Sequence, residues 1–66
     1  MKVQFNKQIT VDYEDARSCE IIDKTFYRNQ IVENVGIEEN SQNFLNLHFE
    51  NGDLAIDIPK GSLTIL

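Results

Sequence analysis

Residues 44–58 read Phe-Leu-Asn-Leu-His-Phe-Glu-Asn-Gly-Asp-Leu-Ala-Ile-Asp-Ile, and this stretch decides the fold. Hydrophobic and polar residues alternate on both sides of Asn51-Gly52, a dipeptide that tolerates the positive φ angles of a two-residue hairpin turn. Folding the stretch at that turn predicts a β-hairpin with its large hydrophobic side chains on one face. The predicted pairs on this face are Phe49 with Leu54, Leu47 with Ile56, and Leu45 with Ile58.

The opposite face of the predicted hairpin is mostly polar. Its cross-strand pairs are Glu50 with Asp53, His48 with Ala55, and Asn46 with Asp57. A lone hairpin is not stable in water, because ordering about fifteen residues costs more backbone entropy than its buried side chains offset. The rest of the chain must therefore cover the hydrophobic face.

Length and composition limit the possible architectures. The chain has 66 residues, which predicts one domain, residues 1–66, with a thin core and no room for a deep cleft. A single cysteine excludes an internal disulfide. No hydrophobic run approaches the length of a membrane span, and no hydrophobic signal segment follows Met1. We therefore expect a cytoplasmic protein without a membrane partner.

The formal net charge of −5 is unevenly distributed along the chain. Residues 1–28 carry five acidic and five basic side chains, which sum to zero. Residues 29–66 carry six acidic side chains against Lys60 alone, which accounts for the whole imbalance. Such a surface repels nucleic acid and attracts a protein partner with a basic surface.

The first half of the chain predicts further strands. Residues 1–13 alternate between hydrophobic and polar types, with Lys7 as the exception. This pattern fits one long strand that bends near Lys7, which we favour, or two strands that pair through a turn at residues 6–8. A three-residue loop at 15–17 then sets Tyr13 opposite Cys19, whose thiol is expected to be buried and unreactive.

The remaining segments are less regular. Residues 25–37 predict an edge strand, or two strands broken by a bulge near Gly36. Residues 38–43 predict a polar loop that leads into the hairpin. Pro59 cannot donate a hydrogen bond to a sheet, so it predicts a turn before a last short strand at residues 63–66.

Together these segments predict an all-β fold. We expect five or six short antiparallel strands in a meander that closes into a small SH3-like or Sm-like barrel. The alternative is an open, curled sheet that a second copy completes. This likeness to small barrels is architectural and implies no function.

The sequence offers little material for catalysis or for metal binding. His48 and Cys19 are the only residues of their types, and the predicted strands place them on opposite faces. A metal site requires more imidazole or thiolate ligands at compatible spacing, and the acids near Asn51 do not have EF-hand spacing. No glycine-rich phosphate loop can be assembled. We therefore expect no enzymatic activity, no cofactor and no metal.

The leading hypothesis is a small, acidic, non-catalytic module that binds a larger protein with a basic surface. Abundant asparagine and isoleucine suggest an AT-rich bacterial or phage genome. If the module is encoded by a phage or a mobile element, we expect it to modulate or inhibit a host protein. Tyr27 and Arg28 are of the residue types found at binding hot spots, and exposed charges would steer the partner. The predicted partner-binding residues are Tyr27, Arg28, Glu33, His48, Glu50, Asp53 and Asp57.

Two alternatives belong to other functional classes. The chain could be a structural homo-oligomer that assembles through edge strands at residues 25–37 or 63–66. It could also be a small nucleic-acid binder that stacks bases on Tyr27, although the net negative charge makes nucleic acid the less favoured partner. The basic residues that such a binder would use are Lys2, Lys7, Arg17, Lys24 and Arg28.

Overall fold

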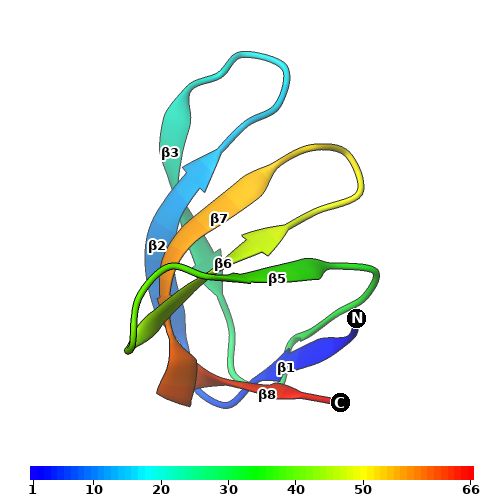
Figure 1. Ribbon diagram of the computed structural model, residues 1–66, viewed down its shortest axis with the longest axis vertical. Coiled ribbons are helices and arrows are strands. Elements are labelled where there is room, and N and C mark those ends of the chain that lie inside the picture. Colours follow the sequence, from blue (N-terminus) through cyan, green and yellow to red (C-terminus); the bar gives the residue numbers. More distant parts are fainter.

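A computed structural model describes all 66 residues and contains eight strands and one short 3-10 turn (Figure 1). The elements are β1 (Val3–Phe5), β2 (Ile9–Glu14), β3 (Ile21–Phe26), β4 (Ile31–Val32), β5 (Gly36–Glu39), β6 (Phe44–His48), β7 (Leu54–Pro59), η1 (Lys60–Ser62) and β8 (Leu63–Ile65). No helix has the length and hydrophobicity that crossing a membrane requires.

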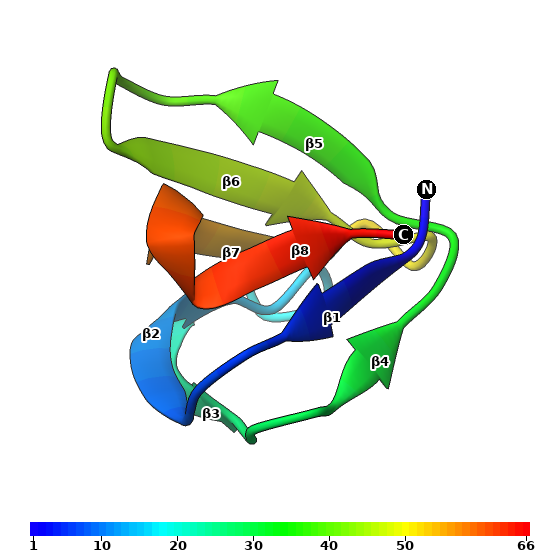
Figure 2. The ribbon, with the colours of Figure 1, turned by 90° about the horizontal axis from the view of Figure 1, so that it is seen from below.

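The strands form two antiparallel sheets. The smaller sheet has the order β4-β1-β8, and the larger has the order β3-β2-β7-β6-β5. The chain passes between the sheets four times, from β1 to β2, from β3 to β4, from β4 to β5, and from β7 through η1 to β8. Figure 2 shows β4, β1 and β8 side by side, with the two ends of the chain close together. Neither sheet closes on itself.

One hydrophobic core lies between the two sheets. The ring of Phe5, from the smaller sheet, stacks on the ring of Phe26, from the larger, with centroids 4.5 Å apart. The core residues are Val3, Phe5, Val11, Phe26, Val35, Leu45, Leu47, Ala55, Ile58 and Leu63. Ser62 is also fully buried, and its hydroxyl donates a hydrogen bond to the Pro59 carbonyl oxygen at 2.6 Å. Residues from both sheets are therefore needed to exclude water.

The structure confirms the all-β, antiparallel prediction, but not its finer details. Eight short strands replace the five or six that were predicted, and they form two sheets in place of a closed barrel. The additional strands arise because the chain turns at positions where alternation alone predicts continuous strands. Asn29 and Asn34 have φ angles of 69° and 59°, and these left-handed residues interrupt the predicted strand at residues 25–37.

That predicted strand is divided into the end of β3, β4 and the start of β5. All three of these strands lie at sheet edges, as does β8 within the predicted strand at 63–66. The edge position was therefore predicted correctly, whereas the continuity of the strand was not.

The N-terminal stretch follows neither predicted arrangement completely. It breaks at residues 6–8, as the hairpin alternative requires, but β1 pairs with β4 and β8 and not with β2. The Asn6 amide N–H donates to the Ser62 carbonyl oxygen at 2.9 Å, which fixes the break near η1. The lapse in alternation at Lys7 thus marks the passage from one sheet to the other.

The hairpin of β6 and β7 exists, but its register contains a bulge. Leu45 pairs with Ile58 as predicted, whereas Leu47 pairs with Ala55 and not with Ile56. From Leu45 to Leu47 the chain of β6 advances by two residues, while β7 advances by three, from Ile58 to Ala55. Asp57 lies within this bulge and has a φ of 56°. As a result Ala55 is fully buried, and Ile56 is only partly buried.

The hairpin of β2 and β3 also differs from its predicted register. Its loop spans residues 15–20, so Tyr13 pairs with Ile22 and not with Cys19. The Asp15 carboxylate accepts backbone N–H bonds from Arg17 and Ser18 at 2.8 and 3.1 Å and shapes the longer loop. Cys19 is exposed with a φ of 59°, so the prediction of a buried thiol is wrong.

The bulge can be tested with two leucine substitutions at neighbouring positions. Ala55→Leu is expected to destabilise the fold by about 1–3 kcal/mol, because it overfills a closed part of the core. Ile56→Leu is expected to stay within about 0.5 kcal/mol of wild type, because it exchanges similar volumes at a partly open position. Urea denaturation measures both. A regular hairpin, with Ile56 in the core and Ala55 in solvent, predicts the reverse order.

Candidate binding surface

Asp53 connects the tips of the two hairpins. Its carboxylate accepts hydrogen bonds from the Tyr13 hydroxyl at 2.5 Å and from the Ala16 backbone N–H at 2.8 Å. The Asn51 side-chain amide donates a third bond at 3.0 Å. Tyr13 and Ala16 belong to the β2–β3 hairpin, and Asp53 belongs to the β6–β7 hairpin. The carboxylate is therefore committed to holding the two tips together.

These bonds change the ionisation of both partners. The hydrogen bond from Tyr13, followed by that from Ala16, holds the pKa of Asp53 below its usual value. Burial, followed by the hydrogen bond to Asp53, raises the pKa of Tyr13. The pair is therefore stabilised with the carboxylate ionised and the phenol protonated.

Glu50 does not lie opposite Asp53 as the two-residue turn predicted. It is exposed in the turn, and with Glu33 and Phe49 it lines a hollow of about 260 Å³. Glu33 also lies 3.4 Å from the ammonium of Lys2, in an exposed ion pair. Two predicted partner-binding residues, Glu33 and Glu50, thus share one hollow.

His48 is exposed, and its carboxylate partner is on β5. The imidazole Nε2 lies 3.2 Å from Glu38 Oε1, which also accepts a bond from the Asn46 side chain at 3.1 Å. The bond from Asn46, and then that from His48, lowers the pKa of Glu38. Glu38 comes from residues 38–43, a segment that the sequence predicted to be a loop.

Asp57 occupies the bulge of β7. Its backbone N–H donates to the Asn46 side-chain oxygen at 3.0 Å, and its carboxylate accepts a bond from the Asn40 amide. Asp57 is exposed despite these bonds. The bulge therefore holds one carboxylate at a fixed position on the surface.

Tyr27 and Arg28 lie in the turn between β3 and β4, and not on a strand. The Gln30 backbone N–H donates to the Tyr27 carbonyl at 3.0 Å, and the Tyr27 N–H donates to the Gln30 side chain at 2.9 Å. Both residues are exposed. They line no hollow with Glu33, His48, Glu50, Asp53 or Asp57.

Two carboxylates that the sequence did not single out lie directly opposite each other on β2 and β3. Asp12 pairs with Asp23, and neither forms an ion pair or a side-chain hydrogen bond. The Asp15 N–H donates to the Glu20 carbonyl at 2.9 Å, and alternation from there makes Asp12–Asp23 a non-hydrogen-bonded pair, the type with the closer side chains. This like-charge contact is unfavourable and has no internal compensation.

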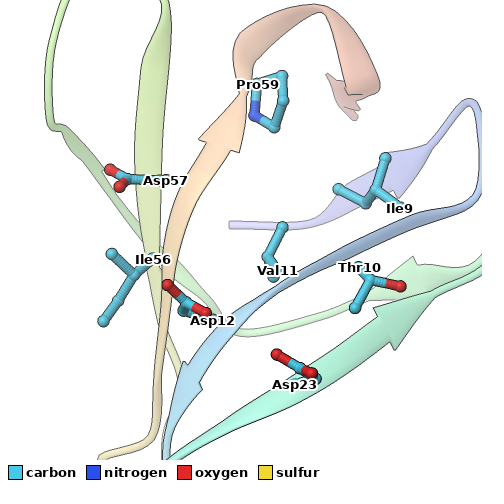
Figure 3. Close-up of a pocket in the computed structure, with 8 residues that line it drawn as sticks. All are labelled: Ile9, Thr10, Val11, Asp12, Asp23, Ile56, Asp57 and Pro59. Carbon is cyan, nitrogen blue, oxygen red and sulfur yellow. The ribbon is translucent and has the colours of Figure 1, made fainter.

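The Asp12–Asp23 pair borders a hollow of about 410 Å³ where β2 and β7 separate (Figure 3). The two strands pair only from Asp12 to Glu14, so they diverge beyond the bulge of β7. Asp57 also lines this hollow, which gives it three carboxylates from three strands and no lysine or arginine. The lining residues are Ile9, Thr10, Val11, Asp12, Asp23, Ile56, Asp57 and Pro59.

The hollow belongs to a wider acidic face, defined here as the outer face of the five-stranded sheet. Because Val11, Leu47 and Ala55 face the core, strand alternation and pairing place their immediate neighbours on the outer face. No strand residue on this face is a lysine or an arginine. Its carboxylates are Asp12, Glu14, Asp23, Glu38 and Asp57.

The acidic face draws on both halves of the chain, so the division of charge at residue 28 did not reveal it. Even-numbered positions of β2 are polar in sequence, and that pattern alone identifies Asp12 as outward-facing. Asp23 lies beside Asp12 only if the loop between β2 and β3 has six residues. Aspartate often accepts backbone hydrogen bonds within turns, so Asp15 was the sequence signal for this longer loop.

No group of three or more histidine, cysteine, aspartate or glutamate side chains has the arrangement needed to hold a metal ion. Comparisons with protein families, with curated proteins and with solved structures find no match to this chain. Its function therefore has to be inferred from its own residues.

The pH dependence of stability tests the role of Asp53. Because the folded-state pKa of Asp53 is lowered, its carboxylate stabilises the fold above the ordinary aspartate pKa of about 3.9, and this contribution is lost as the pH falls through the folded value. Asp53→Asn should therefore be less stable than wild type at pH 7, and the difference should shrink below about pH 4. Urea denaturation across pH 2–7 provides the measurement.

Glu50→Gln is the matched control, because Glu50 lies in the same turn and has no hydrogen-bond partner for its carboxylate. It should leave the acid dependence unchanged. Tyr13→Phe, which removes the donor that lowers the Asp53 pKa most, should weaken the acid dependence in the same direction as Asp53→Asn. Equal profiles for Asp53→Asn and Glu50→Gln would contradict the assignment.

Proposed function

We propose that this chain is a non-catalytic protein-binding module that uses its acidic face to bind a partner with a basic surface. The observation that carries the proposal is the hollow with three carboxylates from three strands and no cation. Within it, backbone pairing places Asp12 directly opposite Asp23, so the two carboxylates share one small area of the surface. A lysine or arginine of the partner would relieve this repulsion and gain two carboxylate acceptors.

The shape and charge of the face favour a protein over a small ligand. The hollow is open and lies on a sheet surface, whereas small-molecule sites are enclosed and mainly apolar. Ile56 and Pro59 add hydrophobic surface beside the carboxylates, which suits the aliphatic stem of a lysine or arginine. The net charge of −5 would speed association with a basic partner at low salt.

The proposal moves the expected contact area from the one that sequence analysis suggested. Asp57 belongs both to the residues predicted from sequence and to the acidic face. Asp53 is committed to internal hydrogen bonds, and Glu33 and Glu50 lie at another hollow. This separation supplies a control with the same change in charge at a different place.

Affinity isolation from cell lysate, with wild type and two double variants, tests the proposal. Asp12→Asn with Asp23→Asn should lose a partner that wild type retains, and that partner should be released as the salt concentration rises. Glu33→Gln with Glu50→Gln removes the same charge elsewhere and should retain the partner. If the Asp12/Asp23 variant retains every partner of wild type, or if only the Glu33/Glu50 variant loses one, the acidic face is not the binding surface.

A separate prediction concerns stability. Asp23→Asn should stabilise the isolated chain by about 0.2–1 kcal/mol, because it removes a directly opposed like-charge pair. Thermal or urea denaturation at low ionic strength measures the gain, and added salt should reduce it. Glu50→Gln, which opposes no acid across a strand pair, should show a smaller change. Destabilisation by Asp23→Asn would mean that the Asp12–Asp23 contact is not repulsive.

A further inference from the structure

The strand β3 is an unprotected edge of the five-stranded sheet. Its first four residues, Ile21 to Lys24, are all exposed, and the exposed fractions of Ile21 and Ile22 are 59% and 47%. The strand has no proline, and its pairing with β2 runs without a bulge over six residues. Proline and bulges are features that commonly prevent an edge from pairing with another chain.

The direction of the free backbone groups follows from the hairpin loop. The Asp15 N–H donates to the Glu20 carbonyl, so this carbonyl points toward β2. Along an antiparallel strand this direction alternates, so Ile22 and Lys24 also bond to β2. The N–H and C=O groups of Ile21, Asp23 and Thr25 therefore point outward from the edge and have no partner within the chain.

We propose that two copies of this chain associate through their β3 edges, as an antiparallel pair with a two-fold axis at Ile22. Ile22 then faces Ile22 of the second copy, and the N–H and C=O groups of Ile21 bond to those of Asp23. On the inner face, Glu20 lies opposite Lys24 of the second copy, and the symmetry gives this contact twice.

Charge complementarity selects this register. Directly opposed residues of an antiparallel pair lie on the same face of the sheet. In a two-fold symmetric pair this holds only if the axis passes beside one residue, which then faces the same residue of the second copy. An axis at Asp23 would oppose two carboxylates, and an axis at Lys24 would oppose two ammonium groups. An axis at Ile21 would place Glu20 against the hydrophobic Ile22. Only the axis at Ile22 pairs an acid with a base.

The isolated chain leaves both of these charges available. Neither Glu20 nor Lys24 forms an ion pair, and the Lys24 ammonium lies 5.8 Å from the centroid of the Tyr13 ring. A lysine on an edge strand ordinarily hinders pairing with another chain. With the axis at Ile22, Lys24 is neutralised by Glu20 of the second copy. Lys24 therefore permits this register and opposes the others.

Sedimentation of the full chain, at concentrations up to about 1 mM, detects association as weak as a millimolar Kd. Wild type should show a monomer–dimer equilibrium. Lys24→Glu or Glu20→Lys alone should raise the dimer Kd about tenfold, because two exposed ion pairs become two like-charge contacts. The double variant that exchanges both charges should return the Kd to within about threefold of wild type. Lys7→Glu, the same charge change away from β3, should leave the Kd within about threefold of wild type.

Disulfide cross-linking tests the register directly, in a Cys19→Ser background. Ile22→Cys should form a cross-linked dimer rapidly, because the proposed axis puts the two Cα atoms about 4.5 Å apart, within the range of a disulfide. Asp23→Cys should cross-link more slowly, because Asp23 faces Ile21. Circular dichroism checks that each variant is folded.

A wild-type chain that is strictly monomeric, a charge exchange that fails to restore association, or faster cross-linking at position 23 than at 22 would overturn the proposal. The charge variants at Glu20 and Lys24 lie outside the acidic hollow, and Asp23, which lines it, is substituted only for cross-linking. Loss of dimerisation is therefore distinguishable from loss of partner binding.

Discussion

The extra residue in β7 is the constraint on which the rest of the structure depends. Without it, Leu47 would pair with Ile56, and Ala55 would face solvent. With it, both Ala55 and Ile58 reach the core, although they are three residues apart and a regular strand would turn them to opposite faces. The bulge also bends β7 away from β2, so their pairing ends at Asp12. The same residue that completes the core therefore opens the acidic hollow.

Alternation in the sequence predicted the parts of the fold that depend only on which side a residue faces. Of the six hairpin residues that it assigned to the hydrophobic face, Leu45, Leu47 and Ile58 are buried, whereas Phe49, Leu54 and Ile56 are only partly buried. It failed at residues whose backbone has a positive φ. Cys19, Asn29, Asn34 and Asp57 adopt left-handed conformations, and each lies where the chain departs from the predicted path. Alternation is silent on such positions, because it records only which side of a strand a residue faces. Three of the four are asparagine or aspartate, which adopt this conformation more readily than other residues with a side chain.

The candidate binding surface was harder to predict, because it depends on register as well as on facing. Asp57 was identified because its hairpin was recognised, although with the wrong partner. Asp12 and Asp23 lie opposite each other only if the β2–β3 loop has six residues, and a three-residue loop places Asp12 against Glu20. Conversely, Asp53 was predicted to bind a partner because Tyr13, which donates to its carboxylate, was placed opposite Cys19. An error of a few residues in loop length therefore exchanged a structural carboxylate for a surface one.

The proposed dimer and the proposed binding function reinforce each other through charge. Pairing at β3 would join two five-stranded sheets edge to edge, so the acidic faces of both copies would meet on one side, with the Asp23 residues close to the joint. Each copy carries a net charge of −5, so this arrangement is opposed by repulsion that low salt intensifies. A basic partner bound to the acidic face neutralises that repulsion and therefore favours the dimer. By linkage, dimerisation must then raise the affinity for the partner by the same factor, so the joined faces would act as one binding surface.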